Sequence, residues 1–308
     1  MKIQFPELPS QIGIAVVPLS GAAIEGTDLA LGLRQLQESG FEVVNYYDHA
    51  QRYQRFGASD EQRIALFYEA LENPAVHVIM SLRGSYGISR LLPLLDFGKI
   101  AASGKLIVGY SDINALQLAL LNKVSVGSLC GPMFCSDFAI PDLRTFTQQH
   151  FQLAMHEQRS DVDFVSDISQ EFSVRGTLWG GNLAMITHLV GTEFLPEIEN
   201  GILFVEDIAE HPYRVERMML QLQMAGILQK QEAILFGDFS GYKLAPHDNG
   251  YDFSAMIAYL RKAISVPIIT GLPFGHCEDK VSLFQGASTE ITHMGTQVSL
   301  RSNIHQNK

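Results

Sequence analysis

The sequence has few cysteines and a clear excess of acidic over basic residues. Its 3 cysteines, Cys130, Cys135 and Cys277, are an odd number, and no pair of them has Cys-x-x-Cys spacing. This excludes a disulfide framework and a cysteine-based zinc site, and it is typical of reduced thiols in a cytosolic protein. With 22 Lys and Arg against 33 Asp and Glu, the formal net charge is -11. An acidic surface attracts neither nucleic acid nor an anionic membrane, so we expect neither as a partner.

The chain also lacks long apolar runs. No run approaches the roughly 20 residues that a membrane span requires. Residues 1–20 contain one lysine, prolines at positions 6 and 9, and an apolar core limited to residues 12–17. That composition is unlike a signal peptide and typical of a first strand. We therefore expect a cytoplasmic protein without a membrane partner.

The first half of the chain alternates strand and helix patterns. Short apolar runs, partly β-branched, predict strands at 12–17, 41–46, 76–82, 106–110 and 124–129. Ser59 and Gln62 form a capping-box pattern that opens one of the intervening helices, and Pro74 ends it. Strands and helices alternating at this spacing predict an α/β fold with a mostly parallel sheet and helices on both faces.

The pattern changes after residue 158. Residues 159–175 are charged and show no periodicity, and we interpret them as a linker. The interpretation gives an α/β domain at 1–158 and a second domain at 176–308. Within the second domain, apolar strands are predicted at 201–205, 233–236 and 266–270.

In one stretch a predicted strand meets a predicted helix with hardly any connection. Only Ser111 and Asp112 separate the apolar run at 106–110 from an apolar helical pattern at 113–121. So sharp a turn places Ser111 on the bend, beside the unpaired N–H groups of the helix start. Such groups can stabilise the oxyanion that forms when a serine attacks an acyl carbon. Alternatively, Ser111 or Asp112 simply caps the helix, since both residue types are favoured N-caps.

Two further candidate residues follow predicted strands. Glu206 stands at the carboxyl end of an apolar strand, where open α/β sheets place ligands and catalytic groups. His276 lies in a Gly/Pro-rich loop after a later strand, and its ordinary pKa of about 6.5 suits a general base. The alternatives are a solvated acid paired with an arginine and one surface histidine among 10. Because Asp207 and Glu210 are also acidic, spacing does not decide which acid matters.

The loop at 83–87, Arg-Gly-Ser-Tyr-Gly, follows another predicted strand. It is suited to hold a phosphate or to supply an oxyanion N–H, and it equally fits a plain tight turn. As a phosphate loop it lacks both the Gly-x-Gly-x-x-Gly and the P-loop patterns. His276 and Cys277 are adjacent and no His-Glu-x-x-His pattern occurs, so we expect no metal site. The order Ser111, Glu206, His276 is that of α/β-hydrolases, but Gly-Tyr-Ser-Asp differs from their Gly-x-Ser-x-Gly.

Five sequence blocks together resemble one family, the LD-carboxypeptidases, which are serine peptidases with a Ser-Glu-His triad. Their relatives include the microcin self-immunity peptidases. The matching blocks stand in the family's order, and they are Arg83-Gly-Ser-Tyr-Gly-Ile-Ser-Arg-Leu-Leu-Pro-Leu-Leu-Asp96, Gly109-Tyr-Ser-Asp112, Gly180-Gly-Asn-Leu183, Val205-Glu-Asp207 with Pro212-Tyr-Arg214, and Gly275-His276.

The resemblance implies a nucleophile at Ser111, a general base at His276 and an orienting carboxylate at Glu206. It implies a flavodoxin-like or amidotransferase-like N-terminal domain that carries Ser111. A smaller β-rich C-terminal domain would carry the other two residues, so the site would lie between the domains. No metal and no organic cofactor is expected.

The resemblance also implies oxyanion donors, namely the backbone N–H of Asp112 and those of the turn at Gly84 and Ser85. We further expect Trp179 and Asn182 to contact the substrate. One departure is Ser85, where the family usually has a second glycine. If the turn needs positive φ at this position, the backbone there is strained.

The implied reaction is removal of the terminal D-alanine from a murein tetrapeptide, in cytoplasmic peptidoglycan recycling, by a homodimeric enzyme. Two alternatives remain. The first is a microcin-type immunity peptidase that cleaves peptidyl-nucleotide amides, for which Trp179 would offer an aromatic platform. The second is a non-catalytic α/β ligand-binding protein, in which Ser111 caps a helix and the loop at 83–87 holds an anion.

Overall fold

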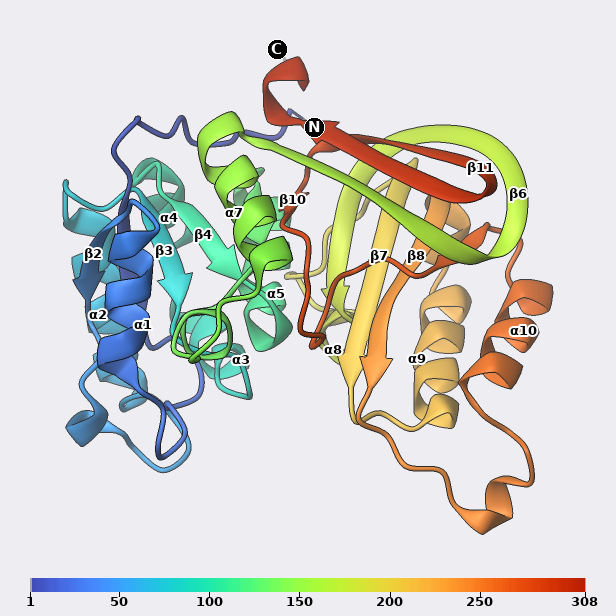
Figure 1. Ribbon diagram of the computed structural model, residues 1–308, viewed down its shortest axis with the longest axis horizontal. Coiled ribbons are helices and arrows are strands. Elements are labelled where there is room, and N and C mark those ends of the chain that lie inside the picture. Colours follow the sequence, from blue (N-terminus) through green and yellow to red (C-terminus); the bar gives the residue numbers. More distant parts are fainter. Residues whose placement is uncertain (1, 308) are drawn as a thin grey trace.

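The computed structural model describes residues 2–307 and contains two sheets, each flanked by helices (Figure 1). The first sheet has the strand order β10-β5-β4-β3-β1-β2. All its neighbouring strands are parallel except β10, which runs antiparallel to β5. The strands are β1 (Gly13–Val17), β2 (Glu42–Asn45), β3 (Val78–Ser81), β4 (Leu106–Gly109), β5 (Ser128–Cys130) and β10 (Leu283–Gln285).

Helices cover both faces of the first sheet because both faces of its strands are apolar. Strand β1 is buried throughout, with Ala15 and Val17 in one core cluster and Ile14 and Val16 in another. The first cluster includes side chains of α2 (Asp60–Glu72), α3 (Ile88–Leu91), α4 (Phe97–Ala102) and α5 (Asn114–Val124). The second includes side chains of α1 (Leu29–Glu38), α6 (Phe134–Asp137) and α7 (Thr145–Glu157). The α/β layering expected from the sequence is confirmed.

The order β2-β1-β3-β4-β5 is the flavodoxin-like order. The chain moves one way from β1 to β2 and the other way from β3 onward. Loops after β1 and β3 therefore diverge and leave a crevice at the carboxyl ends of the strands, where such sheets bind ligands. The fold class expected from the resemblance is thus confirmed for the first domain.

The second sheet has the order β11-β6-β7-β8-β9, in which only β11 is antiparallel to its neighbour. Its strands are β6 (Arg159–Asn182), β7 (Gly201–Ile208), β8 (Gln231–Ser240), β9 (Ile268–Thr270) and β11 (Ser288–Asn303). The helices α8 (Leu183–Leu189), α9 (Pro212–Met224) and α10 (Phe253–Ala263) connect its parallel strands. Short 3-10 helices complete the chain: η1 (His49–Gln51), η2 (Leu92–Leu94), η3 (Ser111–Ile113), η4 (Leu228–Lys230), η5 (Pro246–Asp248) and η6 (Ile304–Asn307).

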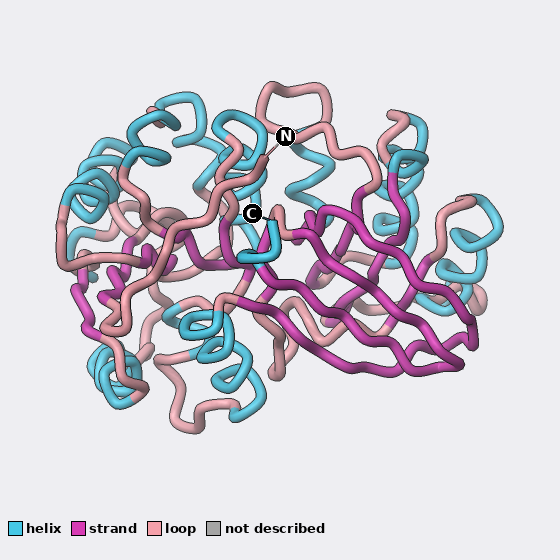
Figure 2. The backbone as a smooth tube through the Cα atoms, turned by 90° about the horizontal axis from the view of Figure 1, so that it is seen from above, coloured by secondary structure: helices cyan, strands magenta, loops and turns pink. Residues whose placement is uncertain are grey.

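The long strands β6 and β11 form a curved ribbon that reaches from the first domain across the second sheet (Figure 1, Figure 2). This corrects the expected linker at 159–175, which forms the first part of β6. Val162 and Phe164 are buried while the acids beside them face outward. The pairing partner lies more than a hundred residues later in the chain, so the local composition gave no sign of it.

The C-terminal range also returns to the first sheet, because β10 pairs with β5. Helix α5 packs against β5 and β10 on one side and against α8 and β6 on the other, which joins the two sheets. The domain division at residues 158 and 176 remains a prediction, since the chain crosses between the sheets three times, from β5 to β6, from β9 to β10 and from β10 to β11. Within residues 2–307, no helix has the length and apolarity needed to span a membrane.

Candidate active site

Ser111 lies at the bend between β4 and α5. Its backbone is left-handed, with φ of +63°. Its Oγ lies 3.2 Å from Nε2 of His276. Neither α5 nor the short helix η3 has a side-chain hydrogen bond at its N-cap. The interpretation of Ser111 as a helix cap is therefore wrong, and the side chain points toward the histidine of the second domain.

Glu206 contacts the other ring nitrogen of this histidine. Nδ1 of His276 lies 2.7 Å from Oε2 of Glu206, whose side chain is fully buried. The pairing of β7 with β8 shifts register between Val205 and Asp207, and such bulges re-aim side chains beside active sites. Gly275 has φ of +130°, and a Cβ there would lie 3.0 Å from Oε2 of Glu206. Glycine before the histidine thus permits the close approach.

Two ionisable side chains of the site, His276 and Asp207, have raised pKa values. Burial by itself lowers the pKa of His276, but the hydrogen bond and the negative charge of Glu206 outweigh it, so the pKa is raised. Burial, together with the charge of Glu206, also raises the pKa of Asp207 to about 6. Both shifts follow from carboxylates gathered in a poorly solvated space.

The side-chain amide of Asn182 donates hydrogen bonds to both Glu206 and Asp207. Its Nδ2 donates to Oε1 of Glu206 at 3.2 Å and to Oδ1 of Asp207 at 3.0 Å. Its backbone N donates to Oδ1 of Asn114 at 2.9 Å, and its own Oδ1 caps α8. Because Oε1 of Glu206 is occupied in this way, Oε2 remains to face the histidine. Asn182 also lines the active-site cavity.

Gly84 lies against Ser111. A Cβ on Gly84 would come within 3.0 Å of Ser111 Oγ, so only glycine fits. Its carbonyl accepts a hydrogen bond from Gly21 N at 3.0 Å, which fixes the loop. Ser85 has φ of +74°, the strained conformation anticipated for a serine in this turn.

Asp112 holds the same loop through its side chain. Its Oδ2 accepts hydrogen bonds from Ser20 Oγ at 2.6 Å and from Ile88 N at 2.8 Å. Burial raises the pKa of this carboxyl. The bond from Ile88 connects Asp112 to the residue that directly follows the loop at 83–87, so the two candidate oxyanion segments are positioned together.

These groups open onto a cavity of about 780 Å³ between the two domains. Its lining includes Gly84, Ser85, Ser111 and Asp112 from the first domain and Asn182, Asp207 and His276 from the second. Tyr110 and Asn114 were not among the residues predicted from the sequence. The ring of Tyr110 lies edge-on to His276 at 5.1 Å between centroids, and Oδ1 of Asn114 accepts from Asn182 N. Their proximity to Ser111 in the sequence was the available signal.

Trp179 requires a correction. Its side chain is fully buried, and its Nε1 donates to Oε1 of Gln231 at 2.7 Å. It packs in the core of the second domain and does not line the active-site cavity. On β6 the side chains alternate between faces, and the sequence alone did not reveal which face Trp179 occupies. The expected contact between Trp179 and a substrate is therefore wrong.

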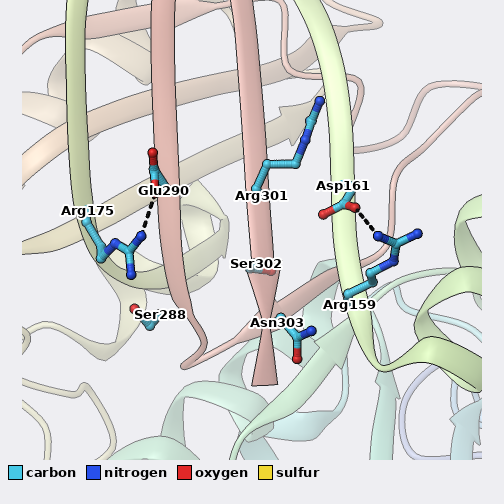
Figure 3. A pocket seen from close by; sticks show the side chains of 8 residues that line it. All are labelled: Arg159, Asp161, Arg175, Ser288, Glu290, Arg301, Ser302 and Asn303. Carbon is cyan, nitrogen blue, oxygen red and sulfur yellow. Dashed lines mark hydrogen bonds and ion pairs between the residues drawn. The ribbon is translucent and has the colours of Figure 1, made fainter. Parts of the chain in front are cut away.

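A second cavity, of about 230 Å³, lies on the ribbon of β6 and β11 (Figure 3). Its three arginines are paired with acids, Arg175 with Glu290, Arg159 with Asp161 and Arg301 with Asp163. None of the described residues that line it is a histidine or a cysteine.

The chain is similar to known proteins over most of its length. The profile of the LD-carboxypeptidase N-terminal domain matches residues 14–131, and that of the C-terminal domain matches residues 175–291. A crystal structure of muramoyltetrapeptide carboxypeptidase from Oxalobacter formigenes superposes with a TM-score of 0.90 and 47% identity, covering 94% of this chain and 98% of that chain.

Two curated relatives are similar in sequence over most of the chain. The murein tetrapeptide carboxypeptidase of Pseudomonas aeruginosa is 30% identical over 274 residues, which are 85% of this chain and 87% of that protein. The microcin C7 self-immunity protein MccF of Escherichia coli is 26% identical over 306 residues, 87% of this chain and 86% of that protein.

Proposed function

The chain belongs to the LD-carboxypeptidase family of serine-type hydrolases, and from this premise we propose that it removes the terminal D-alanine of murein tetrapeptides. The observation that carries the proposal is the hydrogen-bonded series Ser111, His276 and Glu206, at 3.2 Å and 2.7 Å, at the edge of an open cavity. Nucleophile, base and orienting acid in this geometry are what acyl transfer to a serine requires.

In the proposed mechanism His276 takes the proton of Ser111 as the hydroxyl attacks the carbonyl carbon of the bond between the L-centre and D-alanine. Glu206 holds the imidazole with Nε2 toward Ser111 and stabilises the imidazolium that forms. His276 then gives the proton to the leaving amine, and D-alanine departs. Water, activated by the same histidine, hydrolyses the acyl-enzyme and restores Ser111.

The negative charge on the tetrahedral intermediate needs donors that are already in place. The backbone N–H of Asp112 and those of Gly84 and Ser85 are the proposed oxyanion donors. Supporting this, Gly84 lies against Ser111, and the Asp112 carboxylate holds the loop that contains Gly84. Asn182 is a proposed substrate contact and also a positioning residue for Glu206.

The substrate assignment is supported by relatives named for murein tetrapeptide and muramoyltetrapeptide carboxypeptidases. The proposal includes a role in cytoplasmic peptidoglycan recycling and a homodimeric assembly. Cleavage of peptidyl-nucleotide amides, the activity suggested by the relative named for microcin immunity, is less well supported, because the buried Trp179 offers no platform for a base.

A substrate panel tests the proposal. Purified protein is incubated with a murein tetrapeptide, the corresponding tripeptide and a peptidyl-nucleotide amide, each with and without a chelator. We expect chelator-resistant release of D-alanine from the tetrapeptide alone. Cleavage confined to the peptidyl-nucleotide would replace the proposed substrate while leaving the serine chemistry in place. No cleavage of any substrate would contradict the proposal.

A further inference from the structure

Arg55 stands at the first-domain wall of the active-site cavity without an acidic partner. It is exposed, it lines the cavity, and it forms no ion pair within residues 2–307. Its Nη2 donates to Oγ of Ser85 at 2.7 Å, and its guanidinium lies 5.9 Å from the centre of the Tyr86 ring. The arginine is thus held in place while part of its planar fork remains unused.

The position of Ser85 brings this arginine near the chemistry. Ser85 follows Gly84, where an added Cβ would lie 3.0 Å from Oγ of Ser111. Ser85 keeps a side chain although its φ is +74°, a conformation that disfavours one. Its hydroxyl oxygen accepts from Arg55, so its own proton is available to a further acceptor. Strain retained beside an active site points to a use for the side chain.

The charges of the cavity are divided between its walls. Arg55, Arg83 and Asp112 line the first-domain side, whereas the acids Asp207 and Glu210 line the second-domain side. The Asp112 carboxylate accepts hydrogen bonds from Ser20 and Ile88. Arg83 is partly engaged, since its Nη1 donates to the carbonyl of Ala22 at 3.3 Å. A ligand with an anionic end would therefore direct that end toward Arg55 and away from the two acids.

We propose that Arg55 and the hydroxyl of Ser85 form a carboxylate clamp, which binds the free α-carboxylate of the substrate's C-terminal residue. The inference rests on the proposed function, because only a carboxypeptidase needs such a clamp beside its nucleophile. In the substrate, the leaving residue's nitrogen and Cα alone separate this carboxylate from the scissile carbonyl carbon. The fork of an arginine matches a carboxylate with two parallel hydrogen bonds. The clamp selects the chain end over internal bonds.

Binding and turnover test the clamp separately. Affinity for a murein tetrapeptide and for the same peptide ending in D-alaninamide is measured by calorimetry with the inactive variant S111A, with and without R55Q. A hydrogen bond to a charged group contributes about 1.5–3 kcal/mol, so S111A should bind the acid about 10- to 100-fold more tightly than the amide. R55Q should abolish that preference by weakening acid binding, and S85A should reduce it.

Turnover of both peptides is followed in parallel with Ser111 intact. R55Q should lower kcat/KM for the acid about 10- to 100-fold and leave kcat/KM for the amide nearly unchanged. The matched control is R52Q, on the same loop but outside the cavity, which should change neither value. Circular dichroism confirms that each variant is folded.

The outcomes separate the clamp from the proposed function. A preference for the acid peptide that persists in R55Q overturns the clamp. An equal loss of kcat/KM for the acid and the amide peptide also overturns it, because Arg55 would then only support the loop. Absence of turnover in the wild type, with an acid preference that disappears in R55Q, overturns the proposed function and leaves the clamp standing. Equal binding of both peptides before any change at Arg55 overturns the clamp as well.

Discussion

On the first-domain wall of the cavity, two serines adopt the left-handed backbone conformation, Ser85 with φ of +74° and Ser111 with φ of +63°. On the second-domain wall, the residue with positive φ directly before the histidine is Gly275, and Glu206 and His276 are held by the hydrogen bond between their side chains. On the first wall, an unusual backbone conformation thus positions the two serines. On the second wall, the buried carboxylate of Glu206 positions the histidine. Substitutions on the two walls should therefore fail in different ways.

The largest effect is expected at the nucleophile. Ser111→Ala removes the attacking oxygen and should lower kcat for D-alanine release by about 10⁴- to 10⁶-fold. The backbone that shapes the bend is unchanged, so the circular dichroism spectrum should match the wild type. Release measured by a coupled D-alanine assay checks the loss. A variant that retains most of its activity would remove Ser111 from the mechanism.

The acid of the second wall should matter nearly as much. Glu206→Gln keeps the shape but no longer fixes the imidazole or stabilises its cation, which should lower kcat by about 10³- to 10⁴-fold. Burial is the largest influence on the pKa of His276 and lowers it, and without the Glu206 charge only Asp207 still raises this pKa, so the residual activity should persist to lower pH than in the wild type. A pH profile of kcat/KM for both proteins tests this. An unchanged acid limb in the variant would contradict it.

A smaller, pH-dependent effect is expected at Asp207. The base must be neutral, and the pKa of His276 is raised, so wild-type activity should fall as pH drops through a value above the ordinary 6.5 or so. Asp207→Asn removes one charge that raises this pKa and should move the acid limb to lower pH. Glu210→Gln, which removes another acid of the same cavity, is the matched control. Equal shifts in the two variants would show only a general charge effect.

The smallest effect concerns the strain of the first wall. Glycine adopts positive φ without the cost that a Cβ imposes, so Ser111→Gly should be more stable than Ser111→Ala by about 1 kcal/mol. Thermal unfolding of the two variants measures the difference. The same pair of changes at Ser125, left-handed at the end of α5, should give a similar difference with no loss of activity. A difference at Ser125 but none at Ser111 would mean that the bend is unstrained.

Sequence patterns correctly predicted those helices and caps that depend on interactions between residues close together in the chain. The Ser59–Gln62 capping box forms, and α5 is buried from Asn114 through Leu121, as the apolar run around it indicates. Of the three residues singled out after predicted strands, His276 lies within hydrogen-bond distance of both Ser111 and Glu206. Parallel strands of one sheet put their carboxyl ends at one edge, which accounts for Glu206 and His276 in the second sheet, whereas Ser111 follows β4 of the first sheet.

Features that depend on distant pairing were not predictable in this way. The range 159–175 is a strand only because it pairs with β11, and β10 joins the first sheet from the far end of the chain. The burial of Trp179 depends on which face of β6 meets the core. The hydrogen bonds of Asn182 to Glu206 and Asp207 likewise arise only when β6 and β7 lie side by side.

The central claim is that one residue from each wall acts as a single catalytic unit. Measuring kcat for S111A, H276A and the double variant S111A/H276A tests it most directly. Because residues of one unit are strongly non-additive, we predict that the double variant falls no further than the more impaired single variant. If the two losses instead multiply, Ser111 and His276 act independently and the account is contradicted.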